Sequence, residues 1–145
     1  MKVRGFDNRE YSWPPKGHSV DFDDRRKRSQ FHLNCRDLLR KMYPTDIILE
    51  EVPLPGSNRL SADFYLPWRN MVIEVHGEQH YRFNSFFHGS KMAFLESRQR
   101  DLKKIEWCNE NNIEVVELPY NETIEQWRIR IERGNPTTDS CSEAE

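Results

Sequence analysis

Residues 63–80 read DFYLPWRNMVIEVHGEQH, and this stretch decides the fold. It holds parts of two apolar runs separated by PWRN, a pattern that predicts two antiparallel strands joined by a short hairpin link. Because side chains alternate across a strand, the mostly apolar positions of both runs fall on one face. Asp63, Glu74 and His76 then share the opposite face, so acidic and imidazole groups meet where the strands end.

The rest of the chain alternates between helix-like and strand-like segments. We expect helices from Ser29 to the residue before Pro44, over 95–111 and over 123–133, and strands at 47–54, 60–66, 71–75 and 113–118. Ser29 and Thr123 suit the N-caps of the first and last helices. The expected apolar stripe of the long helix consists of Leu95, Leu102, Ile105 and Cys108. The order αβββαβα predicts an α/β fold with a mixed central sheet of about four strands flanked by helices, its last strand running parallel.

The two ends of the chain differ from this middle part in composition. Residues 1–28 mix prolines and charges with the aromatic residues Phe6, Tyr11 and Trp13, which indicates an extended N-terminal arm docked through those aromatics. Residues 134–145 (GNPTTDSCSEAE) predict a disordered acidic tail. One α/β domain over 29–133 remains between them.

Composition restricts the compartment and the class of protein. The chain has 145 residues, 32% of them charged, and a mean hydropathy of −0.92, so we expect one polar domain with no membrane span and no signal peptide. The three cysteines are widely spaced and form no C-x-x-C pair, which argues against a disulfide framework and a structural zinc site. A reduced, cytoplasmic setting fits this composition best.

The net charge of −2 hides an uneven distribution of basic residues. Arg25, Arg26, Lys27 and Arg28 form a basic run, and Arg98, Arg100, Lys103, Arg128 and Arg130 add further positive charge. A small nuclease needs one basic face only, because salt confines phosphate attraction to short range. An ordinary solvated approach to the first helix explains the run equally well.

The shared face has the chemistry of a metal-assisted phosphodiesterase. Two carboxylates on one face repel each other unless a cation lies between them, and oxygen ligands suit Mg²⁺ or Mn²⁺. The backbone carbonyl of Val75 offers a third ligand. His76 or His80 can accept the proton of an attacking water, and Lys104, one turn beyond Asp101, can neutralise phosphate charge.

Two other interpretations of these residues need weighing. Isolated acids on neighbouring strands more often face solvent than catalyse, and a histidine after a strand is often polar filler. The run from His76 to His80 is no zinc-protease motif, because Glu78 occupies its middle position and Gly77 directly after a strand opposes the required helix. The convergence of Asp, Glu, His, Gly, Gln and His in so short a span favours a functional site.

Three segments carry a resemblance to a known family: Asp63, IEVHGEQH at 73–80, and RDLKK at 100–104 ahead of IEVVEL. With them, residues 29–120 resemble the PD-(D/E)xK nuclease superfamily, in the branch near very-short-patch-repair endonucleases and the EDxHD phage homing endonucleases. The resemblance implies a restriction-endonuclease-like core and a Mg²⁺-dependent (or Mn²⁺-dependent) DNA endonuclease of homing or repair type, which nicks DNA or cuts both strands. It suggests a phage-encoded protein in the host cytoplasm.

The resemblance also implies roles for single residues. By position, Asp63 and Glu74 would bind the metal, while His76 stands where the superfamily usually has its lysine, which leaves the general base open between His76 and His80. Many relatives place a glutamate on the first helix; here His32, Glu50 and Glu51 are the alternatives. Gln79 and Asp101 are additional candidates.

Contacts to DNA are expected from the arm at 1–28 and the aromatic loop at 81–94. Arg25, Arg26, Lys27, Arg28 and Arg82 are the expected DNA-binding residues, and Phe83, Phe86 and Phe87 could stack on bases. The phenylalanines could equally cover the sheet end or a dimer surface. A chain this short has little surface to read a long site, so a homodimer or a separate targeting protein would complete it.

Two alternative functions stay open. The missing lysine motivates a non-catalytic DNA-binding or accessory protein that keeps the nuclease fold. A nuclease directed at RNA is compatible with the same residues.

Overall fold

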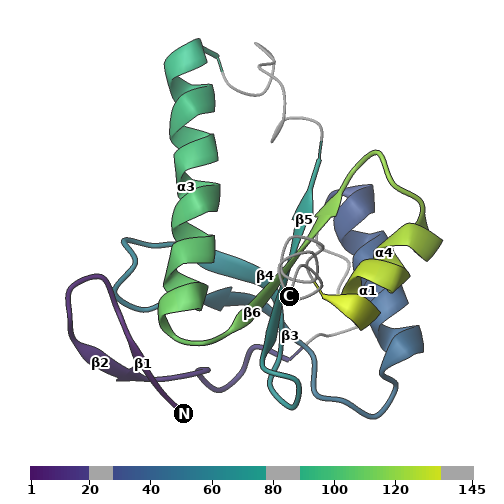
Figure 1. The fold of residues 1–145 in the computed structure, drawn as a ribbon, viewed down its shortest axis with the longest axis horizontal. Helices are drawn as coiled ribbons and strands as arrows, with labels where there is room; N and C mark the ends of the chain where they lie inside the picture. Colours follow the sequence, from purple (N-terminus) through teal and green to yellow (C-terminus); the bar gives the residue numbers. More distant parts are fainter. Residues whose placement is uncertain (20–27, 78–88, 135–145) are drawn as a thin grey trace, which may run out of the picture.

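The structure, a computed structural model, describes residues 1–19, 28–77 and 89–134 (Figure 1). Its elements are β1 (Lys2–Arg4), β2 (Glu10–Ser12), α1 (Gln30–Met42), β3 (Leu49–Pro53), β4 (Ser61–Leu66), β5 (Met71–His76), α3 (Lys91–Glu110), β6 (Glu114–Pro119) and α4 (Ile124–Arg133). The expected α/β class with a four-stranded mixed sheet and flanking helices is confirmed. None of the described helices combines the length and the apolar character that crossing a membrane requires.

The main sheet has the strand order β3-β4-β5-β6. β3 pairs antiparallel with β4, and β4 pairs antiparallel with β5 across the turn at 67–70. β6 follows α3 and pairs parallel with β5, with Glu117 opposite Glu74. The predicted parallel return of the last strand is therefore confirmed, and it brings β6 beside the strand that carries Glu74 and His76.

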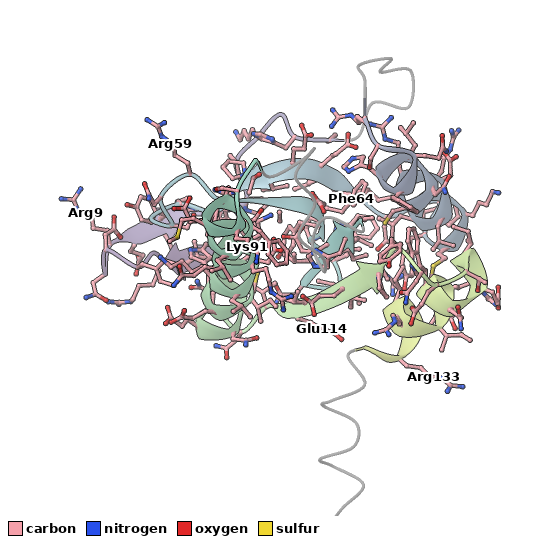
Figure 2. The ribbon with its side chains drawn as sticks, turned by 90° about the horizontal axis from the view of Figure 1, so that it is seen from above. Arg9, Arg59, Phe64, Lys91, Glu114 and Arg133 are labelled. Atoms are coloured by element: carbon pink, nitrogen blue, oxygen red, sulfur yellow. The ribbon has the colours of Figure 1, made fainter. Side chains whose placement is uncertain are left out.

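The two faces of the sheet are covered by different layers. Seen from above, α3 lies on one side of the sheet and α1 and α4 on the other (Figure 2). On the α1 and α4 face, Leu39 and Trp127 belong to one buried cluster with Phe64 and Ile73. On the α3 face, Trp107 packs with Val72 in a second cluster that also contains Ala62, although regular strand alternation would place Ala62 on the same face as Phe64. Ala62 still pairs with Val52 of β3, and the break in alternation falls between the Glu50–Phe64 and Val52–Ala62 pairs, where Glu51 has a φ of +51°.

Local capping chemistry sets the helix starts. The Ser29 Oγ accepts a hydrogen bond from the His32 N–H at 3.1 Å, as the predicted N-cap requires. Thr123 and Gln126 form a reciprocal capping box at the start of α4. α3 begins at Lys91, four residues earlier than expected, because Ser90 caps it by accepting from the Ala93 N–H at 3.1 Å.

The predicted apolar stripe of the long helix is wrong in its first half. Leu95 and Leu102 are 58% and 65% exposed, and the buried residues of α3 are Trp107 and Cys108. Two features explain this exposure: the first half of α3, which carries Leu95, runs past the end of the sheet (Figure 1), and Leu102 lies about 140° around the helix from the buried Trp107. Only the last turns of the helix pack against the sheet.

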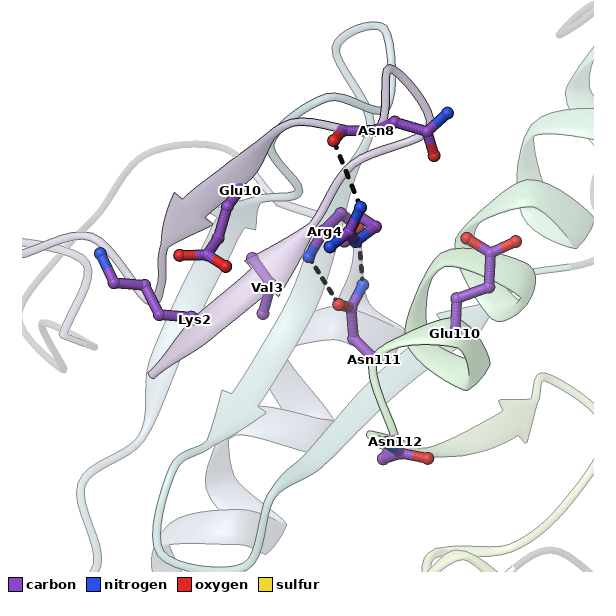
Figure 3. Close-up of a pocket in the computed structure, with 8 residues that line it drawn as sticks. All are labelled: Lys2, Val3, Arg4, Asn8, Glu10, Glu110, Asn111 and Asn112. Atoms are coloured by element: carbon purple, nitrogen blue, oxygen red, sulfur yellow. Dashed lines mark hydrogen bonds between the residues drawn. The ribbon is translucent and has the colours of Figure 1, made fainter.

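The N-terminal residues form more than an extended arm. β1 and β2 pair antiparallel as a separate two-stranded sheet, followed by Trp13, which is buried against Tyr65 with ring centroids 4.2 Å apart. The side-chain amide of Asn111, at the end of α3, exchanges two hydrogen bonds with the backbone of Arg4, at 2.7 and 3.0 Å (Figure 3). This small sheet is thus fastened to the α3 face of the core.

Candidate functional site

Asp63 and Glu74 lie where β4 and β5 separate. The backbone ladder runs from the Leu66–Met71 pair to the Phe64–Ile73 pair, and Asp63 and Glu74 come next. Here the side chains replace backbone partners: the Asp63 N–H donates to Glu74 Oε2 at 3.1 Å, and the Val75 N–H donates to Asp63 Oδ2 at 2.8 Å. The structure therefore brings the two carboxylates together at one end of the sheet.

A lysine from α3 completes this group. Lys104 Nζ lies 3.2 Å from Glu74 Oε1, with side-chain exposures of 21% for Lys104 and 3% for Glu74. Asp101, one helical turn earlier, is half-buried, and its charge favours the protonated lysine. The sequence-predicted residues Asp63, Glu74, Asp101 and Lys104 thus share the α3 side of the sheet.

The protonation of this group follows from burial and neighbouring charge. Burial raises the pKa of Glu74 well above its usual value, and the negative charge of Asp63 raises it further, against the opposing effect of Lys104. Burial lowers the pKa of Lys104, but the Glu74 and Asp63 carboxylates outweigh it and the net shift is upward. The cluster therefore favours an additional positive charge beside Glu74.

His76 lies on the same face, two residues after Glu74. It is buried, and its Nε2 lies 3.3 Å from the Oε1 of Glu117 on β6. Glu117 was not among the predicted site residues. Side chains alternate along β6, so Glu117 and Val115 share a face. Only the parallel register of β5 and β6 reveals that Glu117 on this face lies beside Glu74.

The donor atoms at this end of the sheet fit a hard divalent cation. Glu74 Oε1 is buried and has no aligned hydrogen bond among the described residues. The Val75 N–H points toward β4, and the carbonyl of the same residue points to the same side of the strand. Among residues 1–19, 28–77 and 89–134, no three His, Cys, Asp or Glu side chains converge closely enough to hold a metal. Two carboxylates and a carbonyl suit Mg²⁺, which usually keeps several waters.

His32 and Glu50 lie on the other face of the sheet, under α1. Glu50 is paired in register with Phe64, and the His32 ring stacks on Phe64 at 4.6 Å. Glu50 accepts two hydrogen bonds from Arg36 Nη2, at 2.8 and 2.9 Å, and its Oε1 lies 2.5 Å from His32 Nε2. Burial alone would raise the pKa of Glu50, but the hydrogen bonds from His32 and Arg36 lower it overall. These residues fasten α1 to β3.

Glu51 and Arg28 pair with each other. The Arg28 guanidinium contacts the Glu51 carboxylate and also lies 3.9 Å from Glu50 Oε2. The Arg28 side chain is only 7% exposed, so the last residue of the basic run at 25–28 forms ion pairs with glutamates of this chain. The remaining predicted residues of the site lie outside the described residues: Arg25, Arg26, Lys27, Gln79, His80, Arg82, Phe83, Phe86 and Phe87.

A separate pocket of about 490 Å³ lies between the N-terminal sheet and the end of α3 (Figure 3). Its lining residues are Lys2, Val3, Arg4, Asn8, Glu10, Glu110, Asn111 and Asn112. It contains none of the carboxylates described above.

The chain is similar to several viral proteins. It is 40% identical over 68 residues to uncharacterized protein 033L of Invertebrate iridescent virus 3, and this match covers 47% of this chain and 34% of the relative. It is 40% identical over 65 residues to uncharacterized protein 307L of Invertebrate iridescent virus 6, covering 45% of this chain and 33% of the relative. It is 34% identical over 68 residues to uncharacterized protein 094L of Frog virus 3 (isolate Goorha), covering 46% and 44%.

These matches span less than half of each relative's length. No family model matches the chain, and no solved structure matches it at a significant level. The relatives come from invertebrate and frog viruses, whereas the resemblance had suggested a phage.

Proposed function

We propose that this chain is a divalent-metal-dependent endonuclease that hydrolyses DNA phosphodiesters, by nicking or by cutting both strands. One observation supports it most: Asp63 and Glu74 converge where β4 and β5 separate, with Lys104 beside them. Two adjacent carboxylates without a full set of donors are costly in a buried site, and a cation removes that cost. Cytoplasmic action and a homing or repair role belong to the same proposal.

In this proposal each residue has a defined task. Asp63, Glu74 and the Val75 carbonyl would hold Mg²⁺ or Mn²⁺, which supplies a polarised phosphoryl oxygen and an acidified water when bound. Lys104, positively charged at neutral pH, neutralises charge on the phosphate. His76, on the same face as Glu74, accepts a proton through its imidazole, and His80 is the alternative base.

A non-catalytic DNA-binding protein is the second candidate, and the same ion pair favours it. Lys104 already places a positive charge 3.2 Å from Glu74, which partly balances the carboxylates without a metal. In that case the fold would bind DNA and leave it intact.

Cleavage of supercoiled plasmid separates the two candidates. We expect Mg²⁺ or Mn²⁺ to activate nicking by the unsubstituted chain and EDTA to stop it. Asp63→Ala and Glu74→Ala should each lower the rate by roughly a hundredfold or more. Glu114→Gln, an exposed carboxylate on β6, serves as the matched control and should retain the wild-type rate.

Intact plasmid with every variant would refute the nuclease proposal, and retained DNA binding would then support the accessory protein. Preferential cutting of a labelled RNA in a parallel reaction would identify RNA as the substrate.

A further inference from the structure

The first half of α3 continues past the candidate site. Lys104 reaches Glu74 from the second half of this 20-residue helix, and the first half extends beyond the end of the sheet (Figure 1). A nucleic acid strand with a phosphate at Glu74 would therefore extend alongside these turns.

Helix geometry decides which cations adjoin Lys104. Side chains three or four residues apart share a face, so Ser97 and Arg100 lie in one row with Lys104. At about 100° per residue, Arg100 is offset by about 40° from Lys104, whereas Arg98 is offset by about 120°. Arg100 is thus the exposed arginine nearest the site along the helix, and Arg98 points to another side.

The contacts of these arginines agree with that placement. Arg100 Nη2 donates to Ser97 Oγ at 3.3 Å, a neutral partner, and no described carboxylate forms an ion pair with Arg100. Arg98 lies over the Phe94 ring, 5.9 Å from its centroid. By contrast, Arg128 and Arg130, which the sequence also suggested as basic positions, are paired with glutamates. Arg100 keeps its charge available for an anion.

We infer that Arg100 binds the phosphate next to the one that Lys104 neutralises, so that α3 follows the backbone of the nucleic acid. This inference rests on the proposed function and adds a substrate-binding residue to it. Arg100 and Lys104 are separated by about 6 Å along the helix. Duplex DNA advances about 3.4 Å per base pair along each strand, so two long side chains one turn apart can reach neighbouring phosphates. The exposed Leu95 and Leu102 lie on the opposite side of α3, away from this row.

Two matched substitutions on one helix test the inference. Arg100→Gln and Arg98→Gln each remove one exposed positive charge, and they are made in the Asp63→Asn background so that the DNA stays intact. The affinity for a fluorescein-labelled 30-base-pair duplex is measured by anisotropy at several salt concentrations. We expect Arg100→Gln to weaken binding by roughly tenfold and to reduce the salt slope by about one, and Arg98→Gln to change affinity by less than about twofold.

Cleavage kinetics in the chain with Asp63 intact give a second measurement. Arg100 touches a phosphate that does not react, so Arg100→Gln should raise KM and leave kcat nearly unchanged. Equal effects of the two substitutions on affinity, or no effect of either, would overturn the inference about Arg100. If the unsubstituted chain still cuts plasmid, the nuclease proposal stands in that case. Selective loss of affinity with Arg100→Gln in a chain that never cuts would keep the phosphate contact and refute the nuclease. No binding to the duplex would overturn the inference as well.

Discussion

Asp63 and Glu74 use their carboxylates where a sheet normally uses its backbone. Asp63 accepts a hydrogen bond from the Val75 N–H at 2.8 Å and Glu74 accepts one from the Asp63 N–H at 3.1 Å, just past the last paired residues. This arrangement fixes both side chains without using all their oxygens, since Glu74 Oε1 has no aligned hydrogen bond among the described residues. The two acids are therefore positioned by the fold and still have capacity for a cation.

The sequence predicts part of this cluster. The two-residue period of a strand predicts Asp63, Glu74 and His76 on one face, and in the structure the Asp63 N–H donates a hydrogen bond to the Glu74 carboxylate. The contacts of Lys104 with Glu74, and of Glu117 with His76, depend on how α3 rotates and how β6 registers against β5. Lys104 could be named because it lies one helical turn after Asp101, whereas no local pattern indicates the register that brings Glu117 beside His76.

The raised pKa of Glu74 predicts how pH affects the metal-free protein. The folded state binds this proton more tightly than the unfolded state, whose carboxyl titrates near 4.5, so the stabilisation is complete below that pH and is lost as pH rises through the folded pKa. Glu74→Gln removes this titration. In EDTA, the melting temperature of Glu74→Gln minus that of wild type should therefore increase steadily from pH 5 to pH 8.

Lys104 stays protonated throughout this range, so the loss of its partner adds only a constant offset to that difference. Glu96→Gln, an exposed site on α3, should follow the wild-type curve. A difference for Glu74→Gln that does not change with pH would show that Glu74 is ionised normally.

At the scale of the elements, α3 shows where periodicity misleads. Leu95, Leu102, Ile105 and Cys108 are spaced as one helical face, yet only the end of the helix is covered. Hydrophobic spacing predicts that a helix forms and which side is apolar, but not how far the neighbouring sheet extends beneath it. The caps at Ser29 and Thr123 were predictable because they depend on residues within one turn.

The uneven burial of α3 predicts uneven effects of mutation. Trp107 is fully buried and donates its indole N–H to the Pro55 carbonyl at 3.0 Å, so Trp107→Ala should cost about 3–5 kcal/mol of unfolding free energy. Leu102→Ala, on the exposed side, should cost less than about 0.5 kcal/mol. Urea denaturation followed by circular dichroism measures both, and a large loss at Leu102 would contradict the exposed helix described here.

The whole molecule is a sheet with a helical layer on one face and a composite layer on the other. α1 and α4 form the first, and the end of α3 with the N-terminal sheet forms the second. Gly5 and Gly56 meet so closely that a Cβ on Gly56 would lie 2.6 Å from the Gly5 Cα, and Gly56 has a φ of +71°. The N-terminal segment is therefore an integral part of the core.

The αβββαβα order was predictable from alternation and turn residues, whereas the added β1–β2 sheet was not. Its strands have three residues each, too short for a clear period-two pattern. The sequence hint of a turn between them is Asn8, a residue type that tolerates the positive φ of +63° found there. The sequence predicts that the arm docks through its aromatic residues, and Trp13 does so, but its partners Tyr65 and Trp107 lie far away in the sequence and only the assembled fold identifies them.

The proposed function requires that the carboxylates of Asp63 on β4 and Glu74 on β5 bind one divalent cation. The most direct measurement is an anomalous difference map from crystals soaked in Mn²⁺, beside the same soak of Asp63→Asn crystals. We expect a single strong peak between Asp63, Glu74 and the Val75 carbonyl, which weakens or disappears in Asp63→Asn. Crystals that bind Mn²⁺ elsewhere, or that leave these carboxylates paired with Lys104 alone at saturating Mn²⁺, would contradict it.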